Sequence, residues 1–118
     1  MSDKPTIDPK RAGVRAHQVM NAEINTWGEG HDIRGPLGGM IPSVNDAGVI
    51  EGFSIACPGC GKWGGISFVA YDGFTNPWRV TGGSVDDVTT LTVRNSILKH
   101  CCGWHGFLNC GVFELEAR

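Results

Sequence analysis

Hydrophobic residues recur with helical spacing in one segment near the N-terminus, residues 11–27. Met20, Ile24 and Trp27 occupy positions i, i+4 and i+7, which lie on one face of a helix. The pattern therefore predicts one N-terminal helix, which either packs on a sheet or docks on a partner. An extended polar arm would precede this helix at residues 1–10, and a glycine-rich loop would follow it.

From residue 49 onward, the apolar residues alternate with the spacing of β-strands. The clearest case is 49–57, where neither face is strongly polar, as in a strand that is covered on both sides. The segments predicted as strands are 49–57, 65–71, 78–81, 89–93, 106–109 and 112–116. Short strands separated by turn residues predict a mainly β fold, a small antiparallel sheet built from hairpins. We expect one compact domain in two parts, with the arm, helix and loop at 1–48 and a β domain at 49–118.

Two cysteine motifs in the β part carry the candidate chemistry. The first is Cys57-Pro58-Gly59-Cys60-Gly61, and the second is Cys102-Gly103-Trp104-His105-Gly106. They supply C-x2-C and C-x2-H, and their glycines allow the backbone to bend tightly around an ion. The predicted ligands of Zn²⁺ are therefore Cys57, Cys60, Cys102 and His105, a closed Cys3His site that would staple the sheet.

The second motif leaves its ligands open, because Cys101 competes with Cys102 and His100 is a further candidate. A redox pair, a disulfide and unrelated buried cysteines are the alternatives to zinc. A redox C-x2-C motif opens a helix, whereas glycine-rich sequence follows Cys60, which favours metal. The 41 residues at 61–101 exceed ordinary zinc-finger spacing, so strands should join the two motifs.

Composition narrows the classes of function. The chain has 118 residues and a formal net charge of −2, so it has no overall basic field for a large nucleic-acid footprint. Eighteen glycines and six prolines favour many turns, and five cysteines cannot all pair with one another. The sequence shows no signal peptide and no membrane-spanning stretch. We expect no membrane partner and a reducing intracellular compartment, where C-x2-C binds metal.

Four stretches within residues 53–116 carry a resemblance to a known family. They are the knuckle at 57–61, Trp78, the segment 91–97 and the ending at 102–113, which has the form C-G-W-H-G-F-L-N-C-G-V-F. This half of the chain resembles the DUF6527-like group, small proteins of bacteriophages and mobile bacterial loci with a predicted zinc site. The resemblance implies a phage-type origin and a metal site, but no activity.

We expect a small structural or interaction protein with a closed zinc site. Its partner would be another protein, and the resemblance suggests a virion accessory component that is found in the host cytoplasm or incorporated in the virion. Zn²⁺ would contribute to folding and not to catalysis, because a closed site leaves no open coordination position.

Two other functions are alternatives. A nucleic-acid-binding zinc knuckle would use a basic and aromatic patch made of Lys62, Trp63, Arg79, Arg94, Lys99 and Trp104. A zinc-dependent hydrolase would need an open metal position and a general base, for which the candidates are His31, Glu51, Asp86 and Glu114. The chain has no H-E-x-x-H motif and no deaminase motif, so the hydrolase ranks last.

Overall fold

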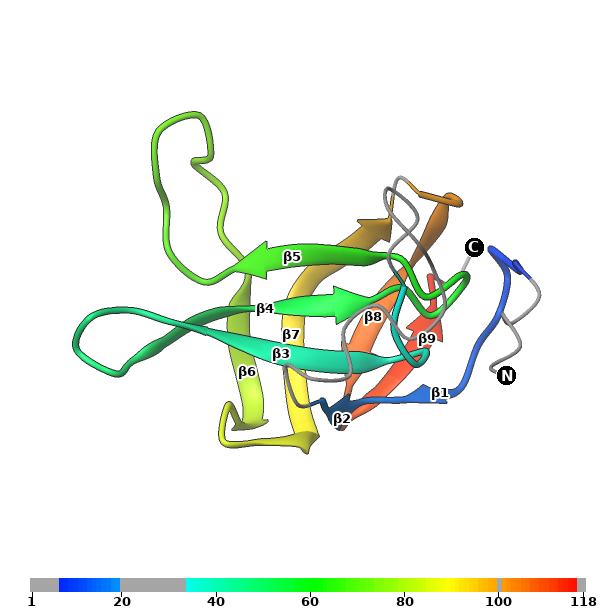
Figure 1. Ribbon diagram of the computed structural model, residues 1–118, viewed down its shortest axis with the longest axis horizontal. Helices are drawn as coiled ribbons and strands as arrows, with labels where there is room; N and C mark the ends of the chain where they lie inside the picture. Colours follow the sequence, from blue (N-terminus) through cyan, green and yellow to red (C-terminus); the bar gives the residue numbers. More distant parts are fainter. Residues whose placement is uncertain (1–6, 20–33, 100, 117–118) are drawn as a thin grey trace.

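The computed structural model describes residues 7–19, 34–99 and 101–116, which form two β-sheets (Figure 1). The strands of this described part are β1 (Val14–Arg15), β2 (His17–Gln18), β3 (Gly39–Val44), β4 (Ile50–Ala56), β5 (Trp63–Ser67), β6 (Arg79–Ser84), β7 (Asp87–Lys99), β8 (Trp104–Asn109) and β9 (Val112–Leu115). The described part contains no helix that is long and apolar enough to cross a membrane. The prediction of a mainly β fold is confirmed.

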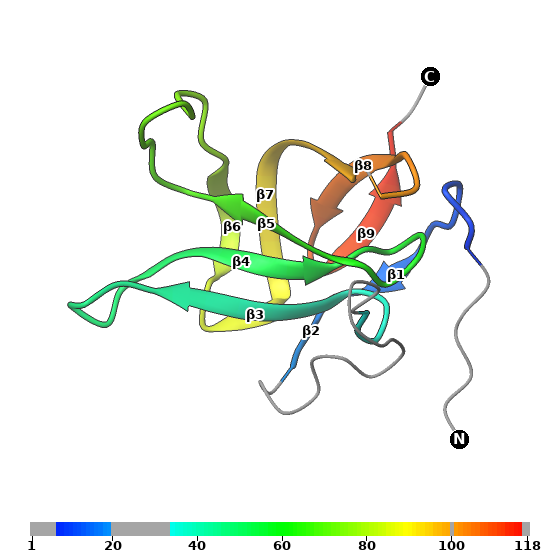
Figure 2. The ribbon, with the colours of Figure 1, turned by 45° about the horizontal axis from the view of Figure 1, so that its top comes forward.

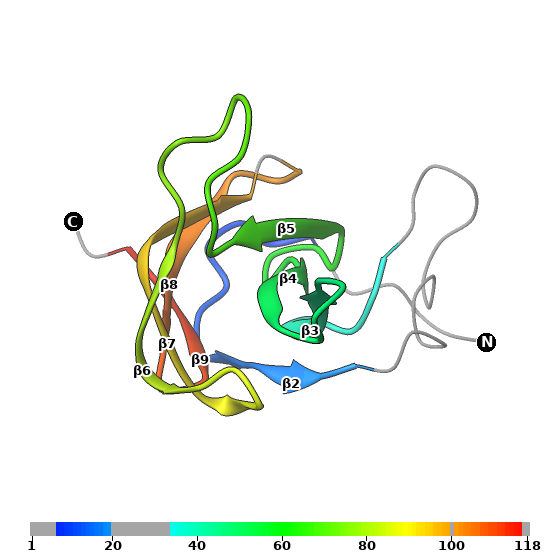
Figure 3. The same cartoon turned by 90° about the vertical axis from the view of Figure 1, so that its left-hand side faces the viewer.

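The two sheets face each other across one core, as the side view in Figure 3 shows. One sheet has the strand order β1-β9-β8-β7-β6 and is antiparallel, and the other has the order β2-β3-β4-β5. In this second sheet the β2–β3 pair is parallel, and the β3–β4 and β4–β5 pairs are antiparallel. Phe53 and Ile55 on β4, together with Leu91 and Val93 on β7, are at most 1% exposed, and they bring the core together from both sheets. Side chains of a strand alternate between its two faces, so this spacing buries one face of each sheet.

The N-terminal segment crosses from one sheet to the other. Val14 on β1 pairs with Phe113 on β9, and His17 on β2 pairs with Gly39 on β3. Ala16 lies between these two pairings and is buried, at 2% exposure. The segment therefore holds one edge of the molecule together by joining both sheets.

The predicted N-terminal helix is wrong over residues 11–19, because this stretch is extended and contains β1 and β2. Backbone groups that would bond within a helix find partners on two open sheet edges instead. The apolar residues that suggested a helix fall mostly at 20–27, which lie outside the described residues. The first part of the expected arm, residues 1–6, also lies outside them.

The strands expected after residue 49 are confirmed in number and order, with shifted ends. The expected hairpin around the first cysteine motif is formed by β4 and β5, and the C-terminal hairpin is formed by β8 and β9. The last of these hairpins turns at Cys110 and Gly111, as the sequence predicts, and both residues have positive φ. Strand β7 is longer than expected, because pairing with β8 extends it to Lys99.

Strand β3 falls within the segment that was expected to be a loop. It pairs with β4 over most of its length, from Met40 opposite Ile55 to Val44 opposite Ile50. Pro42 lies inside it and cannot donate a hydrogen bond. Because β2 pairs only with Gly39 and Met40, Pro42 has no described strand on its other side, and an edge position of this kind tolerates proline.

The turn from β4 to β5 and the turn from β7 to β8 approach each other at one end of the molecule (Figure 2). The first turn contains Cys57 and Cys60, and the second contains Cys101 and Cys102. The two turns belong to different sheets, so any bond between them ties the two sheets together.

Candidate metal centre

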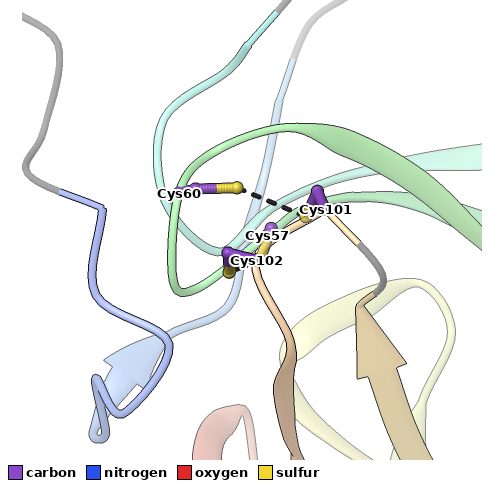
Figure 4. A group of neighbouring side chains, drawn as sticks. All are labelled: Cys57, Cys60, Cys101 and Cys102. Atoms are coloured by element: carbon purple, nitrogen blue, oxygen red, sulfur yellow. Dashed lines mark hydrogen bonds between the residues drawn. The ribbon is translucent and has the colours of Figure 1, made fainter.

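Four cysteine side chains converge between the two turns (Figure 4). The Sγ atoms of Cys57, Cys60, Cys101 and Cys102 all lie within 4.8 Å of one another. The Sγ atoms of Cys60 and Cys101 are 3.3 Å apart, and those of Cys57 and Cys102 are 3.6 Å apart. Four thiolates around Zn²⁺ at about 2.3 Å place their sulfurs about 3.8 Å apart in a tetrahedron. The cluster therefore has the dimensions of a tetrathiolate site.

The first turn is shaped by its own backbone. The amides of Cys60 and Gly61 both donate to the carbonyl of Cys57, at 3.3 and 2.7 Å. Gly61 has a φ of +85°, which glycine adopts without strain, and the amide of Gly59 donates to Cys57 Sγ at 3.3 Å. An amide that points at a sulfur stabilises the thiolate form, so this turn suits a metal ligand.

Gly59 also makes room for the second turn. A Cβ atom at position 59 would lie 2.7 Å from Cys102 Sγ and 2.9 Å from the Asp8 carbonyl oxygen. The Asp8 amide donates to the Gly59 carbonyl at 2.8 Å, so the N-terminal segment runs over this turn. The absence of a side chain at Gly59 lets the sulfur and the N-terminal backbone approach together.

The second turn closes the β7–β8 hairpin, in which Lys99 pairs with Trp104. The amide of Gly103 donates to the Lys99 carbonyl at 2.8 Å, and Gly103 has a φ of +85°. This tight turn places the side chains of Cys101 and Cys102 next to those of the first turn. Burial differs across the cluster: Cys57 and Cys60 are buried, Cys102 is half-buried and Cys101 is exposed.

His105 lies outside this cluster, in contrast to the predicted Cys3His set. Its Nε2 atom is 2.9 Å from Ser96 Oγ and 2.9 Å from a carboxylate oxygen of Glu116. The reason is the strand that begins at Trp104: Trp104 points into the core, so its neighbour His105 points to the opposite face. The structure thus brings three of the four predicted ligands together and adds Cys101, the competitor that the sequence left open.

Burial and neighbouring groups shift the pKa values of three of the thiols, Cys57, Cys60 and Cys101. Burial raises the pKa of Cys57, and the nearby cysteines act in the same direction. Burial also raises the pKa of Cys101. For Cys60, burial opposes ionisation, but hydrogen bonds from the Lys62 backbone and from the other thiols outweigh it and lower the pKa. Without a cation, the cluster therefore favours a mixture of thiols and thiolate over four negative charges.

The residues proposed for nucleic-acid binding do not form one exposed patch. Trp104 is 0% exposed and Lys99 is 7% exposed, so neither can contact a partner directly. Arg79 and Arg94 lie opposite each other on β6 and β7, on exposed positions of the larger sheet. The expected patch thus loses two of its members to the core.

The candidate bases for hydrolysis do not belong to the cysteine cluster. Among the described residues, the metal-binding group contains only cysteines, and Glu51, Asp86 and Glu114 lie elsewhere on strand β4, the β6–β7 turn and strand β9. His31 lies outside the described residues. Cys110 is exposed at the β8–β9 turn and is also not a member of the cluster.

Comparisons with family models, curated proteins and solved structures return no match to this chain. The resemblance to the DUF6527-like group therefore stays a prediction.

Proposed function

We propose that this protein is a small structural or interaction module whose two sheets are tied together by one Zn²⁺ ion. The ligands would be Cys57, Cys60, Cys101 and Cys102. A single observation carries the proposal: four sulfurs from two turns of different sheets lie within 4.8 Å of one another. Thiolate ligands select zinc over the hard cations magnesium and calcium.

The donor set favours a structural role. Four protein thiolates fill a tetrahedral shell, so no position is left for a water molecule or a substrate. Such a site contributes to folding free energy directly. The two cysteine turns belong to different sheets, and among the described residues no backbone hydrogen bond joins one turn to the other. The ion would therefore link the two sheets at this end of the molecule.

A module of this kind would act by presenting its surface to another protein. The resemblance to small phage proteins supports a virion accessory component as its biological role. In this proposal zinc holds the fold, and the exposed strands and loops supply the contacts.

The test is metal content and its effect on folding. The full chain, purified under reducing conditions, should contain one zinc ion per molecule by elemental analysis. X-ray absorption at the zinc edge should show four sulfur neighbours at about 2.3 Å. Removal by a chelator should lower the thermal midpoint, and added zinc should restore it. A protein that neither contains nor takes up zinc would contradict the proposal. An oxygen or nitrogen ligand in the coordination shell would instead favour a catalytic role.

A further inference from the structure

One charged side chain is buried beside the cysteine cluster. Lys99, the last residue of β7, is only 7% exposed. It is the one charged residue that is buried among the described residues. Its Nζ atom donates to the carbonyl of Ile55 at 3.1 Å. A Cβ atom at Gly64 would lie 2.5 Å from this Nζ, so the ammonium group lies directly over the Gly64 backbone on β5.

An ammonium group in this position requires compensation. Removing a charge from water is unfavourable unless an opposite charge or hydrogen bonds replace the lost solvent. One carbonyl contact is present, and no carboxylate of the described residues forms an ion pair with Lys99. Lys99 and Cys101 line the same cavity. Burial lowers the pKa of Lys99, and the four neighbouring cysteines, when they are ionised, oppose this shift.

A metal tetrathiolate would provide the negative partner that the Lys99 ammonium group lacks. Zn²⁺ with four thiolates carries a net charge of −2, and the two sulfurs of the first turn are themselves buried. Building on the proposed zinc site, we propose that Lys99 is a charge-compensating residue, whose buried ammonium group offsets the negative zinc–thiolate centre and strengthens its affinity for metal. Lys99 is not a ligand, because its Nζ bonds to Ile55 and has no hydrogen bond to a sulfur in the structure.

The position of Lys99 fits this role. It lies two residues before Cys101, and its carbonyl accepts from the Gly103 amide, so its backbone is part of the second turn. Its side chain reaches across to the other sheet and contacts β4 and β5 next to the first turn. The same residue therefore touches both elements that carry the ligands.

The experiment compares Lys99→Met with Lys62→Met in the full chain. Methionine keeps the length and apolar stem of lysine but removes its charge. Lys62 lies in the first turn, two residues after Cys60, but it is exposed, so water screens its charge. The zinc dissociation constant of each variant is measured by competition with a chromophoric chelator.

We expect Lys99→Met to bind zinc about 10–100-fold more weakly, the usual effect of losing a group that supports metal ligands. Lys62→Met should stay within about threefold of the unaltered protein, because exposed charges contribute little. The cobalt-loaded Lys99→Met protein should keep the thiolate-to-cobalt absorption of a tetrahedral site at saturation. A purely packing role predicts no loss of affinity, since an apolar residue of equal size commonly replaces a buried charge without destabilisation.

Gly64→Ala provides a second variant that keeps the charge. Its methyl group would displace the ammonium from its place over β5, so metal affinity should again fall. Unchanged zinc affinity in both Lys99→Met and Gly64→Ala, with one zinc per unaltered chain, would overturn this inference and leave the zinc site intact. Equal losses in Lys99→Met and Lys62→Met would also overturn it. Failure of the unaltered protein to bind zinc would instead overturn the proposed function.

Discussion

Cys60 and Cys101 lie 41 positions apart in the sequence, yet their Sγ atoms are 3.3 Å apart in the fold. Cys60 belongs to the β4–β5 turn of one sheet, and Cys101 belongs to the β7–β8 turn of the other. The contact therefore spans the gap between the sheets. A metal ion at this point would restrict the motion of one sheet relative to the other, which separates this site from a zinc knuckle confined to a single hairpin.

The ligand set gives the first prediction. Cys101→Ser should lose stoichiometric zinc or lower zinc affinity at least 100-fold, because a hydroxyl is a poor substitute for a thiolate ligand. His105→Gln should retain one zinc per chain, since His105 contacts Ser96 and Glu116 and not the cluster. Elemental analysis and chelator competition on the two variants decide the matter. Loss of zinc in His105→Gln with retention in Cys101→Ser would restore the Cys3His set expected from the sequence.

The ionisation of the thiols gives the second prediction, which concerns pH. The pKa values of Cys57 and Cys101 are raised above the ordinary value of 9.0, so near neutral pH both are thiols in the metal-free protein. Zinc must displace these two protons to bind, so its affinity should rise by at least about 100-fold per pH unit between pH 6 and 8. Cys60, whose pKa is lowered, should contribute less to this slope.

The measurement is chelator competition at several pH values, with calorimetry in buffers of different ionisation enthalpy to count the protons released. Affinity and proton release should agree, at two or more protons per zinc. An affinity that does not change with pH would show that the thiols are already ionised in the metal-free protein, contrary to the burial of Cys57.

Local sequence patterns predicted the parts of this fold that depend on neighbouring residues. The hairpin of β4 and β5 follows from alternation on either side of Cys57-Pro58-Gly59-Cys60-Gly61, and the β8–β9 turn follows from Asn109-Cys110-Gly111. The close approach of the two cysteine motifs was also predictable, because ligand chemistry requires it. These features rest on residues that are near one another in the chain or share one chemistry.

Long-range pairing explains what the sequence did not predict. Strand β1 forms because Val14 meets Phe113 at the edge of a sheet, about a hundred positions later in the chain, and no local period encodes that contact. The sequence favours His105 as a ligand because C-x2-H mirrors C-x2-C. The spacing is real, but the strand beginning at Trp104 turns the imidazole to the other face. Cys101 has no matching spacing, and only the tight turn before Gly103 brings its sulfur to the cluster.

Gly59 gives the third prediction, which separates metal binding from folding strain. In Gly59→Ala the new methyl group would lie 2.7 Å from Cys102 Sγ, so the sulfur must move and zinc affinity should fall about 10-fold or more. The control is Gly48→Ala in the β3–β4 turn, where φ is +82° and a Cβ meets nothing within 4 Å. This control should cost about 1 kcal/mol of stability from backbone strain and leave zinc affinity unchanged.

Chelator competition measures the affinities of both glycine variants, and urea unfolding of the zinc-loaded proteins measures their stability. If Gly59→Ala binds zinc as tightly as the unaltered protein, Cys102 is not held where the structure places it. If Gly48→Ala lowers zinc affinity as much as Gly59→Ala does, the effect belongs to general destabilisation and not to the site.

Trp104 gives the last prediction, because it links the core beneath the metal centre to the N-terminal segment. Its side chain is 0% exposed and packs edge-to-face on Phe113, and its Nε1 donates to the Arg11 carbonyl at 2.7 Å. Trp104→Phe removes this hydrogen bond and leaves a cavity, so the free energy of unfolding should fall by about 2–3 kcal/mol. Trp78→Phe is the matched control: Trp78 also donates to a carbonyl, that of Ser96 at 3.1 Å, but it is only half-buried.

Urea unfolding at saturating zinc should show the larger loss for Trp104→Phe, and limited proteolysis should cut residues 7–13 faster in that variant than in Trp78→Phe. Both results follow if the indole of Trp104 anchors the N-terminal segment against β8, because the segment loses its bond to the core while the metal remains bound. Equal losses in the two variants, with no change in the cleavage of residues 7–13, would mean that the β1–β9 pairing and the backbone bond from Asp8 to Gly59 hold the segment in place without the indole.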